Sequence, residues 1–500
     1  MIRWRDVDND VYCGSLFSAF ASLSRGEAWS FPALRPHQRE PWHAFTVQVA
    51  ALALIRAGID ALPESEDAWR DLLIGLTPDF PDGEAWALVV EDWSKPALLQ
   101  PPVVAGGNRA DYKSRLATPD ALDMLVTAKN HDLKQSRMAG ASEEEWLFAL
   151  VTLQTTEGFL GAGNYGVSRM NGGFASRMSL GVRPAAGGAE AAFRRDVQRL
   201  VADARARPDR RGGIPLLWTV PWDGTVSLAF GDLDELYVEV CRRVRLHRRE
   251  AGGIEALAAG SKCARVAAAE LKGKTGDPWA PMKADGSSSH TPTGAGFGYR
   301  QMAQLLDTGR ITLPLLAAPH DGDDRTDLSI VAAALVRGQG KTEGLHRRAV
   351  RTSRMEDIDA WEQAPLDRIG HVAGKRADEA GEAGRRLRRA LISLVQGGPE
   401  QARLDDDAAK KKTERWLDQF NRMVDHDFFD ADFWSEAASD DGNHRLKWRG
   451  RLRAMAGEVF EIAAAAAPRT EMRRVRAKAR GRAVLDGQMG KWMKEAEHGE

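Results

Sequence analysis

The stretch from about residue 350 to residue 500 constrains the fold most, because it is rich in Ala, Arg, Glu and Leu and has few strand signals. Long patterns of helical periodicity follow one another there, over about 356–375, 377–396, 406–437 and 444–495. Since proline breaks a helix interior, Pro468 should divide the last pattern into two pieces. Residues 351–500 are therefore predicted to form a C-terminal four-helix bundle.

Residues 1–350 mix helix and strand signals instead. An Ala- and Leu-rich run at 45–55 predicts a buried helix. Ser142, which precedes three glutamates, predicts the start of another helix that ends near residue 156, because serine caps a first turn and acidic residues suit its positive end. The chain is thus expected to be α+β, with a large irregular α/β N-terminal domain followed by the bundle.

Three further segments of this N-terminal domain carry local signals. Residues 218–222 and 226–230 are expected to be strands on either side of an Asp-Gly turn. Residues 233–246 are expected to be helical. Residues 272–300 are rich in Gly, Pro and Ser and predict a long loop, and loops of this length are often functional.

The charge balance limits what the chain can bind by itself. Its 70 Lys and Arg residues face 71 Asp and Glu residues, which leaves a net charge of −1. A protein that grips DNA alone by neutralising many phosphates is usually basic overall. Any nucleic-acid contact must therefore come from local patches, or other subunits must supply the grip.

Cysteine usage and hydropathy point to a cytoplasmic protein with no membrane partner. Cys13, Cys241 and Cys263 are far apart and form no C-x-x-C pair, so neither a disulfide framework nor a cysteine-built zinc site is expected. This usage fits a reducing compartment. The N-terminus has no signal-peptide pattern, and the apolar run at 45–55 is too short to span a bilayer.

Residues 158–177 form a glycine-dense stretch, called the glycine loop below. Glycine allows positive φ and a close approach of a ligand to the main chain. A nucleotide site, a main-chain contact to nucleic acid and a surface connection with glycines at its turns all fit this composition. The stretch carries neither G-x-G-x-x-G after a clear strand nor the Gly-Lys-Ser/Thr of a P-loop, which weighs against the nucleotide site.

Two other segments are candidate sites. Lys129, Asn130 and His131 precede Asp132, and a His beside an Asp suggests general-base chemistry or half of a metal nuclease site. The other histidines show no companion pattern, so a polar loop is the simpler interpretation. Residues 337–348 combine a Gly-rich tip with Gln, Lys and an Arg pair, which suits either a basic hairpin that reaches base edges or a solvated hairpin at a domain boundary.

Basic runs complete the set of candidate surfaces, and they lie at 242–249, 385–389 and 473–480. On helices such runs are usually solvated faces paired with nearby acids. The run at 473–480 is the least balanced by acids, which makes it the better candidate for an RNA, DNA or partner contact.

An ordered set of segments resembles the CasA family, the large subunit of the type I-E CRISPR surveillance complex (Cascade). These segments are residues 35–43, 96–100, 129–134, 153–155, 170–174 and 339–345. They cover most of 30–350, and the bundle matches in helical character and position. Gly340 departs from the family hairpin, where Ala is common, so this tip is more flexible.

The resemblance implies recognition of the protospacer-adjacent motif (PAM) on double-stranded DNA. By position, Asn171, Gly172 and Gly173 would bring backbone groups to the minor groove, and Lys272 or Lys274 would read it. Gln339, Gly340 and Lys341 would form a wedge that splits the first base pairs, and Lys129, Asn130 and His131 would lie in a recognition loop.

The resemblance also implies partners: the backbone, small, guide-end and guide-processing subunits of Cascade, the CRISPR guide RNA, the target duplex and a helicase–nuclease that is recruited once the target is open. No cofactor, metal or intrinsic catalysis is expected. The main alternative is a nucleotide- or metal-dependent nucleic-acid hydrolase that uses the glycine loop with His131 and Asp132. A second alternative is a guide complex that nicks or inserts DNA without the usual helicase–nuclease.

Overall fold

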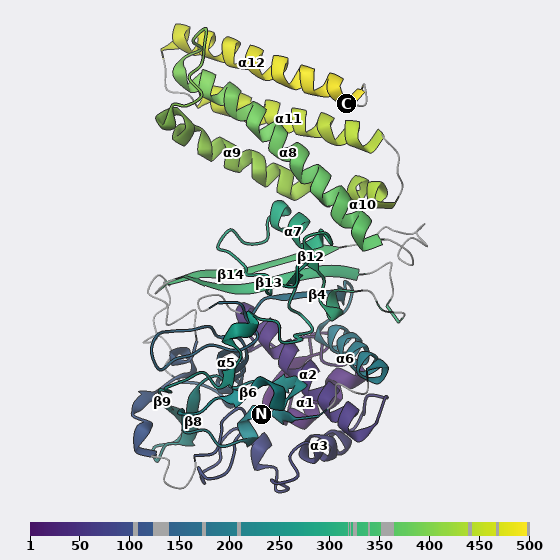
Figure 1. Cartoon of the computed structure of the whole chain (residues 1–500), viewed down its shortest axis with the longest axis vertical. Coiled ribbons are helices and arrows are strands. Elements are labelled where there is room, and N and C mark those ends of the chain that lie inside the picture. Colours follow the sequence, from purple (N-terminus) through teal and green to yellow (C-terminus); the bar gives the residue numbers. More distant parts are fainter. Residues whose placement is uncertain are drawn as a thin grey trace. The chain divides into compact units, whose positions relative to one another are not determined.

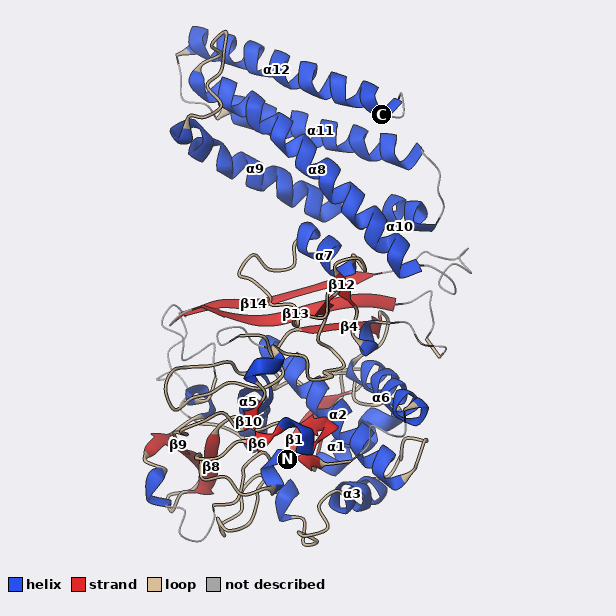
Figure 2. Ribbon diagram, viewed as in Figure 1, coloured by secondary structure: helices blue, strands red, loops and turns tan. Residues whose placement is uncertain are grey.

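The chain folds into two compact units, seen in a computed structural model (Figure 1). The structure describes residues 1–103, 109–123, 140–172, 177–207, 212–318, 320, 322–323, 328–338, 341–351, 365–438, 443–466 and 470–497. The first unit comprises Met1–Gly296 and Thr312–Ser353, and the second comprises Phe297–Ile311 and Arg354–Glu500. Sheets occur in the first unit and helices dominate the second, which confirms the predicted α+β class (Figure 2).

The boundary between the two units is not a single point in the sequence, because of the short segment 297–311. It belongs to the helical unit, although some forty residues that follow it return to the first unit. The predicted domains, 1–350 and 351–500, place the segment 297–311 in the first domain. These domain boundaries stay a prediction.

The second unit is built from six helices in the described part of the chain. They are α7 (Tyr299–Leu306), α8 (Pro365–Gln396), α9 (Asp407–Asp427), α10 (Ala431–Ala438), α11 (Asn443–Ala465) and α12 (Glu471–Glu497). The long helices α8, α9, α11 and α12 form the predicted four-helix bundle (Figure 1).

Helix boundaries in the bundle differ from the periodic patterns in two places. The patterns expected over 356–375 and 377–396 belong to one continuous helix, α8, from Pro365 onward. The pattern expected over 406–437 is instead two helices, α9 and α10. Packing explains the first difference, because Ala373, Ala380 and Ala383 are fully buried, and this apolar stripe continues across the expected break. The division around Pro468 is confirmed, since α11 ends and α12 begins on either side of it.

The first unit contains five helices and a set of small sheets among its described residues. The helices are α1 (Leu16–Arg25), α2 (Arg39–Ala57), α3 (Glu66–Gly75), α5 (Glu143–Thr156) and α6 (Ala189–Ala206). The strands are β1 (Ile2–Arg5), β2 (Val11–Gly14), β3 (Ser114–Leu116), β4 (Ser179–Pro184), β5 (Ile214–Leu216), β6 (Leu228–Ala229), β7 (Leu233–Val238), β8 (Arg243–Arg248), β9 (Ile254–Ala259), β10 (Val266–Ala267), β11 (Met282–Lys283), β13 (Leu328–Gly338) and β14 (Lys341–Arg351). The two-residue strand β12 (Ile311–Thr312) lies at the boundary between the units.

Helix α2 is the centre of the first unit. Every residue from Pro41 to Leu54 is buried, so the helix is covered on all sides, as its Ala- and Leu-rich composition predicts. Its polar Gln48 is satisfied because its side-chain amide donates to the carbonyl oxygens of Leu236 and Tyr237, at 3.3 and 3.1 Å. Helix α2 therefore fixes the position of β7.

Two secondary-structure expectations in this unit are wrong. Residues 233–246 hold the strands β7 and β8, and β7 is stabilised by the distant Gln48 amide, which local periodicity does not contain. Residues 218–222 and 226–230 do not pair with each other. Trp218 lies in a 3₁₀ turn, where its buried indole donates to the carbonyl of Ala85 at 2.9 Å, and β6 pairs with β10 instead.

Helix α5 begins as predicted at a Ser142 cap. The Ser142 hydroxyl accepts from the Glu145 amide at 3.4 Å, and the Glu145 carboxylate accepts from the Ser142 amide at 2.8 Å. This reciprocal capping box satisfies two donors at the helix end. We expect Ser142→Ala to lower the free energy of unfolding by about 1 kcal/mol in urea denaturation. Ser114→Ala, on an exposed edge strand, is the control, and equal effects of the two changes would contradict the capping role.

Candidate nucleic-acid interface

A three-stranded sheet brings two of the candidate segments to the same end of the first unit. Its order is β14–β13–β4, with both pairs antiparallel (Figure 2). Ala333 pairs with Ser179, the first residue of β4, and β13 continues beyond this pair to Gly338. The glycine loop therefore enters β4 at the sheet end where the β13–β14 hairpin closes. The predicted hairpin is confirmed, with Gly338 paired to Lys341.

The glycine loop meets the segment that carries Lys272 and Lys274. The side-chain amide of Asn171 donates to the carbonyl oxygen of Ser289 at 3.1 Å, and the Ser289 amide donates to the carbonyl oxygen of Lys272 at 3.0 Å. Ser289 thus joins Asn171 to the lysine segment through hydrogen bonds on both sides. A Cβ added to Gly273 would come within 2.1 Å of the Ser289 hydroxyl and 3.1 Å of the Asn171 amide, so only glycine fits at this crossing.

Residues 272–274, called the lysine turn, expose two cations on a tight backbone. Lys272 has φ of 52° and Gly273 has φ of 81°, so two consecutive residues are left-handed. A lysine rarely adopts this conformation, and such strain persists only where the surroundings impose it. Gly273 is buried while Lys272 and Lys274 are exposed. The two exposed lysines therefore lie on a backbone turn that is next to Asn171, which the exposed Gly172 follows.

A buried ion pair fastens the end of the glycine loop to the residues after the lysine turn. The Arg177 guanidinium donates to both carboxylate oxygens of Asp277, from Nε at 2.5 Å and from Nη2 at 2.7 Å. It also donates to the Gln48 side chain and lies 5.2 Å from the Trp279 ring centroid. Burial raises the pKa of Asp277, but the charge and hydrogen bonds of Arg177 outweigh it, so that the pKa lies below its usual value.

A second buried cluster holds the start of the Asn171 segment. The carboxylate of Glu239 accepts from the Ser168 amide and from the Ser168 hydroxyl, both at 2.7 Å. Arg169 donates to the carbonyl oxygen of Tyr237 at 2.7 Å, and its guanidinium lies 3.9 Å from the Tyr237 ring centroid. Burial raises the pKa of Glu239 to about 7. Asn171 therefore follows two residues that are fixed to the body of the unit.

The candidate recognition loop lies outside the described residues, so the structure does not position Lys129, Asn130 or His131. It does position the residues on either side. Asp123 accepts hydrogen bonds from Arg35 at 3.1 Å and from His37 at 2.8 Å, both from the segment before α2. On the far side, Ser142 starts α5.

The remaining wedge and minor-groove candidates fall partly outside the described residues. Gln339, Gly340 and Gly173 are not among them, and Lys341 is described only as the first residue of β14. The structure thus brings Asn171 and Gly172 together with Lys272 and Lys274, and it leaves the wedge and recognition-loop assignments as predictions.

The basic runs differ in their surroundings. The run at 242–249 lies largely in β8, where Arg245 is fully buried and donates to the carbonyl oxygens of Lys95 and Gln100, at 3.0 and 3.2 Å. Burial lowers the pKa of Arg245 to about 10. It is therefore not the solvated helical face that was expected. The run at 473–480 lies on α12, where Arg473, Arg474 and Arg476 are exposed.

No group of three or more His, Cys, Asp or Glu residues that could hold a metal ion occurs in the described part of the chain. His131 and Asp132, the residues of the hydrolase alternative, lie outside that part. Among the described helices, none is both long and apolar enough to cross a membrane.

Several residues that shape this surface carry no local sequence signal. Ser289, Asp277 and Glu239 act on the glycine loop from 71 to 118 residues away along the chain. The one signal in the sequence is a charged residue among apolar neighbours, such as Asp277 next to Trp279, which is buried. Such a residue needs a partner for its charge when it is buried. This signal identifies a buried charged residue but does not identify the residue that pairs with it.

Together these features define an α+β body that displays a glycine loop and a lysine turn, followed by a bundle of four long helices. A scan against protein-family models finds no match. A search of curated proteins finds no match either. The solved structures do contain similar folds.

CasA from Thermus thermophilus matches with a TM-score of 0.64 and 14% identity, over 98% of each chain. Cse1, the CRISPR-associated protein from Acidimicrobium ferrooxidans, matches with a TM-score of 0.61 and 15% identity, over 99% of this chain and 97% of that one. Cse1 from Thermobifida fusca matches with a TM-score of 0.54 and 14% identity, over 98% and 96%. The chain therefore has the CasA (Cse1) fold, which confirms at the level of the fold the resemblance seen in its sequence.

Proposed function

We propose that this chain is the large subunit of a type I-E Cascade complex and recognises the PAM in double-stranded DNA through the minor groove. One observation carries the proposal: in a chain with the CasA fold over nearly its full length, Asn171 and the lysine turn are joined through Ser289 on one surface. An exposed glycine backbone beside two exposed lysines supports contact with a nucleic acid, because both can approach a groove closely.

The chemistry of this surface suits a loose sequence code. The minor groove mainly distinguishes A·T from G·C, because most of its hydrogen-bonding groups are acceptors common to both orientations of a pair. A side-chain amide, backbone N–H groups and an ammonium group are the donors that such acceptors need. We therefore expect tolerance of several PAMs, with Asn171, Gly172 and Gly173 at the groove and Lys272 or Lys274 reading it.

Opening of the duplex belongs to the same proposal. Gln339, with Gly340 and Lys341, would insert beside the PAM, which costs on the order of a few kcal/mol of base stacking. Pairing between guide RNA and target strand then replaces the lost DNA pairing at near-balance, and this pairing supplies sequence specificity. A subunit with a net charge of −1 suits this arrangement, because the guide and the other subunits hold the long target.

The proposed partners follow from this role. They are the backbone, small, guide-end and guide-processing subunits, the guide RNA, the target duplex and a recruited helicase–nuclease, in the cytoplasm. The chain itself performs no catalytic step and needs no cofactor. Lys129, Asn130 and His131 would order on the guide–target assembly.

The test is target binding by the guide-loaded complex, rebuilt with and without this chain, on matched duplexes with a randomised PAM. We expect PAM-selective binding to require the chain and to weaken about tenfold or more in Lys272→Ala, Lys274→Ala, since one of the two lysines reads the groove and the loss of one such contact is worth about 1–3 kcal/mol. Lys113→Ala, an exposed lysine elsewhere in the first unit, should leave binding unchanged. Gln339→Ala should reduce strand opening more than binding.

Other results would overturn the proposal. Binding and opening that do not depend on this chain would remove the CasA role. Metal-dependent DNA cleavage by the isolated chain, abolished by His131→Ala, would establish the hydrolase instead.

A further inference from the structure

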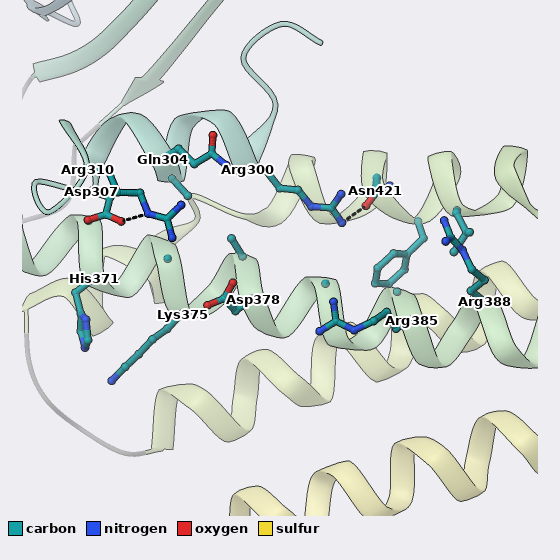
Figure 3. Close-up of a pocket in the computed structure, with 18 residues that line it drawn as sticks. Arg300, Gln304, Asp307, Arg310, His371, Lys375, Asp378, Arg385, Arg388 and Asn421 are labelled. Carbon is teal, nitrogen blue, oxygen red and sulfur yellow. Dashed lines mark hydrogen bonds and ion pairs between the residues drawn. The ribbon is translucent and has the colours of Figure 1, made fainter. Parts of the chain in front are cut away.

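The helical unit contains a groove that the proposed PAM surface does not use. It has a volume of about 790 Å³ and is lined by α7, α8 and α9, all within the second unit (Figure 3). On α8 the lining residues run from Gly370 to Arg388 with helical spacing. At 1.5 Å per residue this face is about 27 Å long, which matches roughly eight residues of an extended polypeptide.

Cations outnumber carboxylates along the groove. Its walls carry five Lys and Arg side chains and His371, against the two carboxylates Asp307 and Asp378 (Figure 3); the Lys and Arg residues are Arg300, Arg310, Lys375, Arg385 and Arg388. Like charges crowded in a concave site attract an anion, because the low-dielectric walls concentrate their field.

The cations differ in how far they are already neutralised. Arg310 pairs with Asp307 at 3.0 Å, and Arg385 pairs with Glu382. Arg300 donates to the neutral side-chain oxygen of Asn421 at 3.2 Å, so it keeps its charge (Figure 3). Lys375 and Arg388 are exposed, and neither has an acidic partner among the residues that the structure describes. These two cations are the most available to a ligand.

The floor of the groove is open because α8 has glycines there. Glycine in a helix interior costs about 0.5–1 kcal/mol relative to Ala. Packing accounts for Gly370, where an added Cβ would come within 2.1 Å of the Leu306 carbonyl oxygen in α7. It does not account for Gly374, since no described atom lies within 4 Å of a Cβ there, or for Gly381, which has only the Arg385 side chain at 3.7 Å.

The lining favours a polypeptide over a nucleic acid. Single strands bind proteins largely by stacking on exposed aromatic rings. Of Phe, Tyr and Trp, the described lining contains Phe420, which is fully buried and lies against Gly384. Asp378 repels any anion, but its carboxylate can accept backbone N–H groups of a peptide, whereas a phosphodiester backbone offers it no donor.

We infer that this groove binds an acidic segment of a partner protein in extended form, with Lys375, Arg388 and Arg300 pairing with its carboxylates. Gly374 and Gly381 let the peptide backbone lie against α8. The inference does not depend on PAM recognition, because the groove lies within the helical unit alone.

The test uses the isolated full-length chain and a fluorescein-labelled octaglutamate peptide, with anisotropy as the readout at low salt. We expect Lys375→Glu, Arg388→Glu to weaken binding tenfold or more, since two attractions become repulsions. Gly381→Leu should weaken it similarly without changing charge, because the side chain fills the floor. Lys411→Glu, Lys412→Glu changes the same charge on exposed residues of α9 outside the lining and should alter affinity less than twofold.

Three results would overturn the inference. They are no binding of octaglutamate, equal binding by the groove and control variants, and tighter binding of an oligothymidylate of eight phosphates that competes with the peptide. The last would mark the groove as a nucleic-acid site. Since no guide complex is involved, failure here leaves PAM recognition untouched, and the reverse also holds.

Discussion

Arg177→Met is expected to lower the free energy of unfolding by about 3–5 kcal/mol, the largest effect of any single change considered. Met keeps much of the buried volume but removes both hydrogen bonds to Asp277, whose side chain is fully buried. The loss is large because an ionised carboxylate would remain in the interior without its counter-charge. Urea denaturation at pH 7 measures it.

A paired variant separates the lost charge from the lost packing. Arg177→Met, Asp277→Asn leaves no unpaired charge, and the new side-chain amide would still offer an oxygen to the Trp279 backbone N–H, which now donates to Asp277 at 3.2 Å. This double variant should recover much of the stability, since a buried ion pair contributes little net. Its PAM-selective binding should stay low, because the glycine loop has lost its tie to the residues after the lysine turn.

The matched control is an exposed ion pair. Arg248 pairs with Glu143 at 3.1 Å, and their side chains are 61% and 42% exposed. Arg248→Met should cost no more than about 1 kcal/mol, because solvent screens such pairs. Equal losses in Arg248→Met and Arg177→Met would mean that burial of the Asp277 pair adds nothing to its contribution to stability.

The sequence predicted those parts of the fold whose stability is local. Helices α2 and α5 were foreseen because one is apolar all round and the other starts with its own cap. The strands β7 and β8 were missed because their stability comes from outside them. Gln48 satisfies carbonyl groups of β7, and β8 pairs with β9, so tertiary contacts overrode the local periodicity.

The candidate interface was predictable residue by residue but not as an arrangement. Asn171 and the two lysines were chosen through the resemblance to CasA. That Ser289 joins them could not be read from the chain, since 118 residues separate it from Asn171. The same holds for Arg177 and Asp277, which are 100 residues apart. Which charged residues pair in the interior depends on the folded geometry. A single sequence does not show which acidic residue pairs with which basic one.

Glu239→Gln is expected to remove a pH dependence of stability worth about 3 kcal/mol. Burial raises the pKa of Glu239 from an ordinary value near 4.5 to about 7, against the opposing effects of Ser168, Arg169 and Arg177. Between these values the folded chain binds a proton at Glu239 that the unfolded chain has released. Stability from this group is therefore complete below about pH 4.5 and is lost as pH rises through 7.

The hydrogen bonds around Glu239 make this ionisation matter for the glycine loop. The Ser168 hydroxyl donates to the carboxylate at 2.7 Å, so the Tyr237 hydroxyl, 2.6 Å away, donates to Ser168. A protonated Glu239 can instead donate to the Ser168 hydroxyl, which reverses the direction of the hydrogen bonds from Tyr237 through Ser168 to Glu239. Because Ser168 lies three residues before Asn171, the loop is anchored to a group that titrates near neutral pH.

Urea denaturation of wild type and Glu239→Gln between about pH 4 and pH 8 isolates this group, since other titrations cancel in the difference. The difference in unfolding free energy should move toward the Gln variant by about 3 kcal/mol across that range, as wild type alone must hold an ionised carboxylate in the interior. Glu270→Gln, at an exposed carboxylate, should give a flat difference. A flat difference for Glu239→Gln as well would mean that Glu239 ionises in the folded chain as freely as in water, and that the Ser168 anchor does not respond to pH.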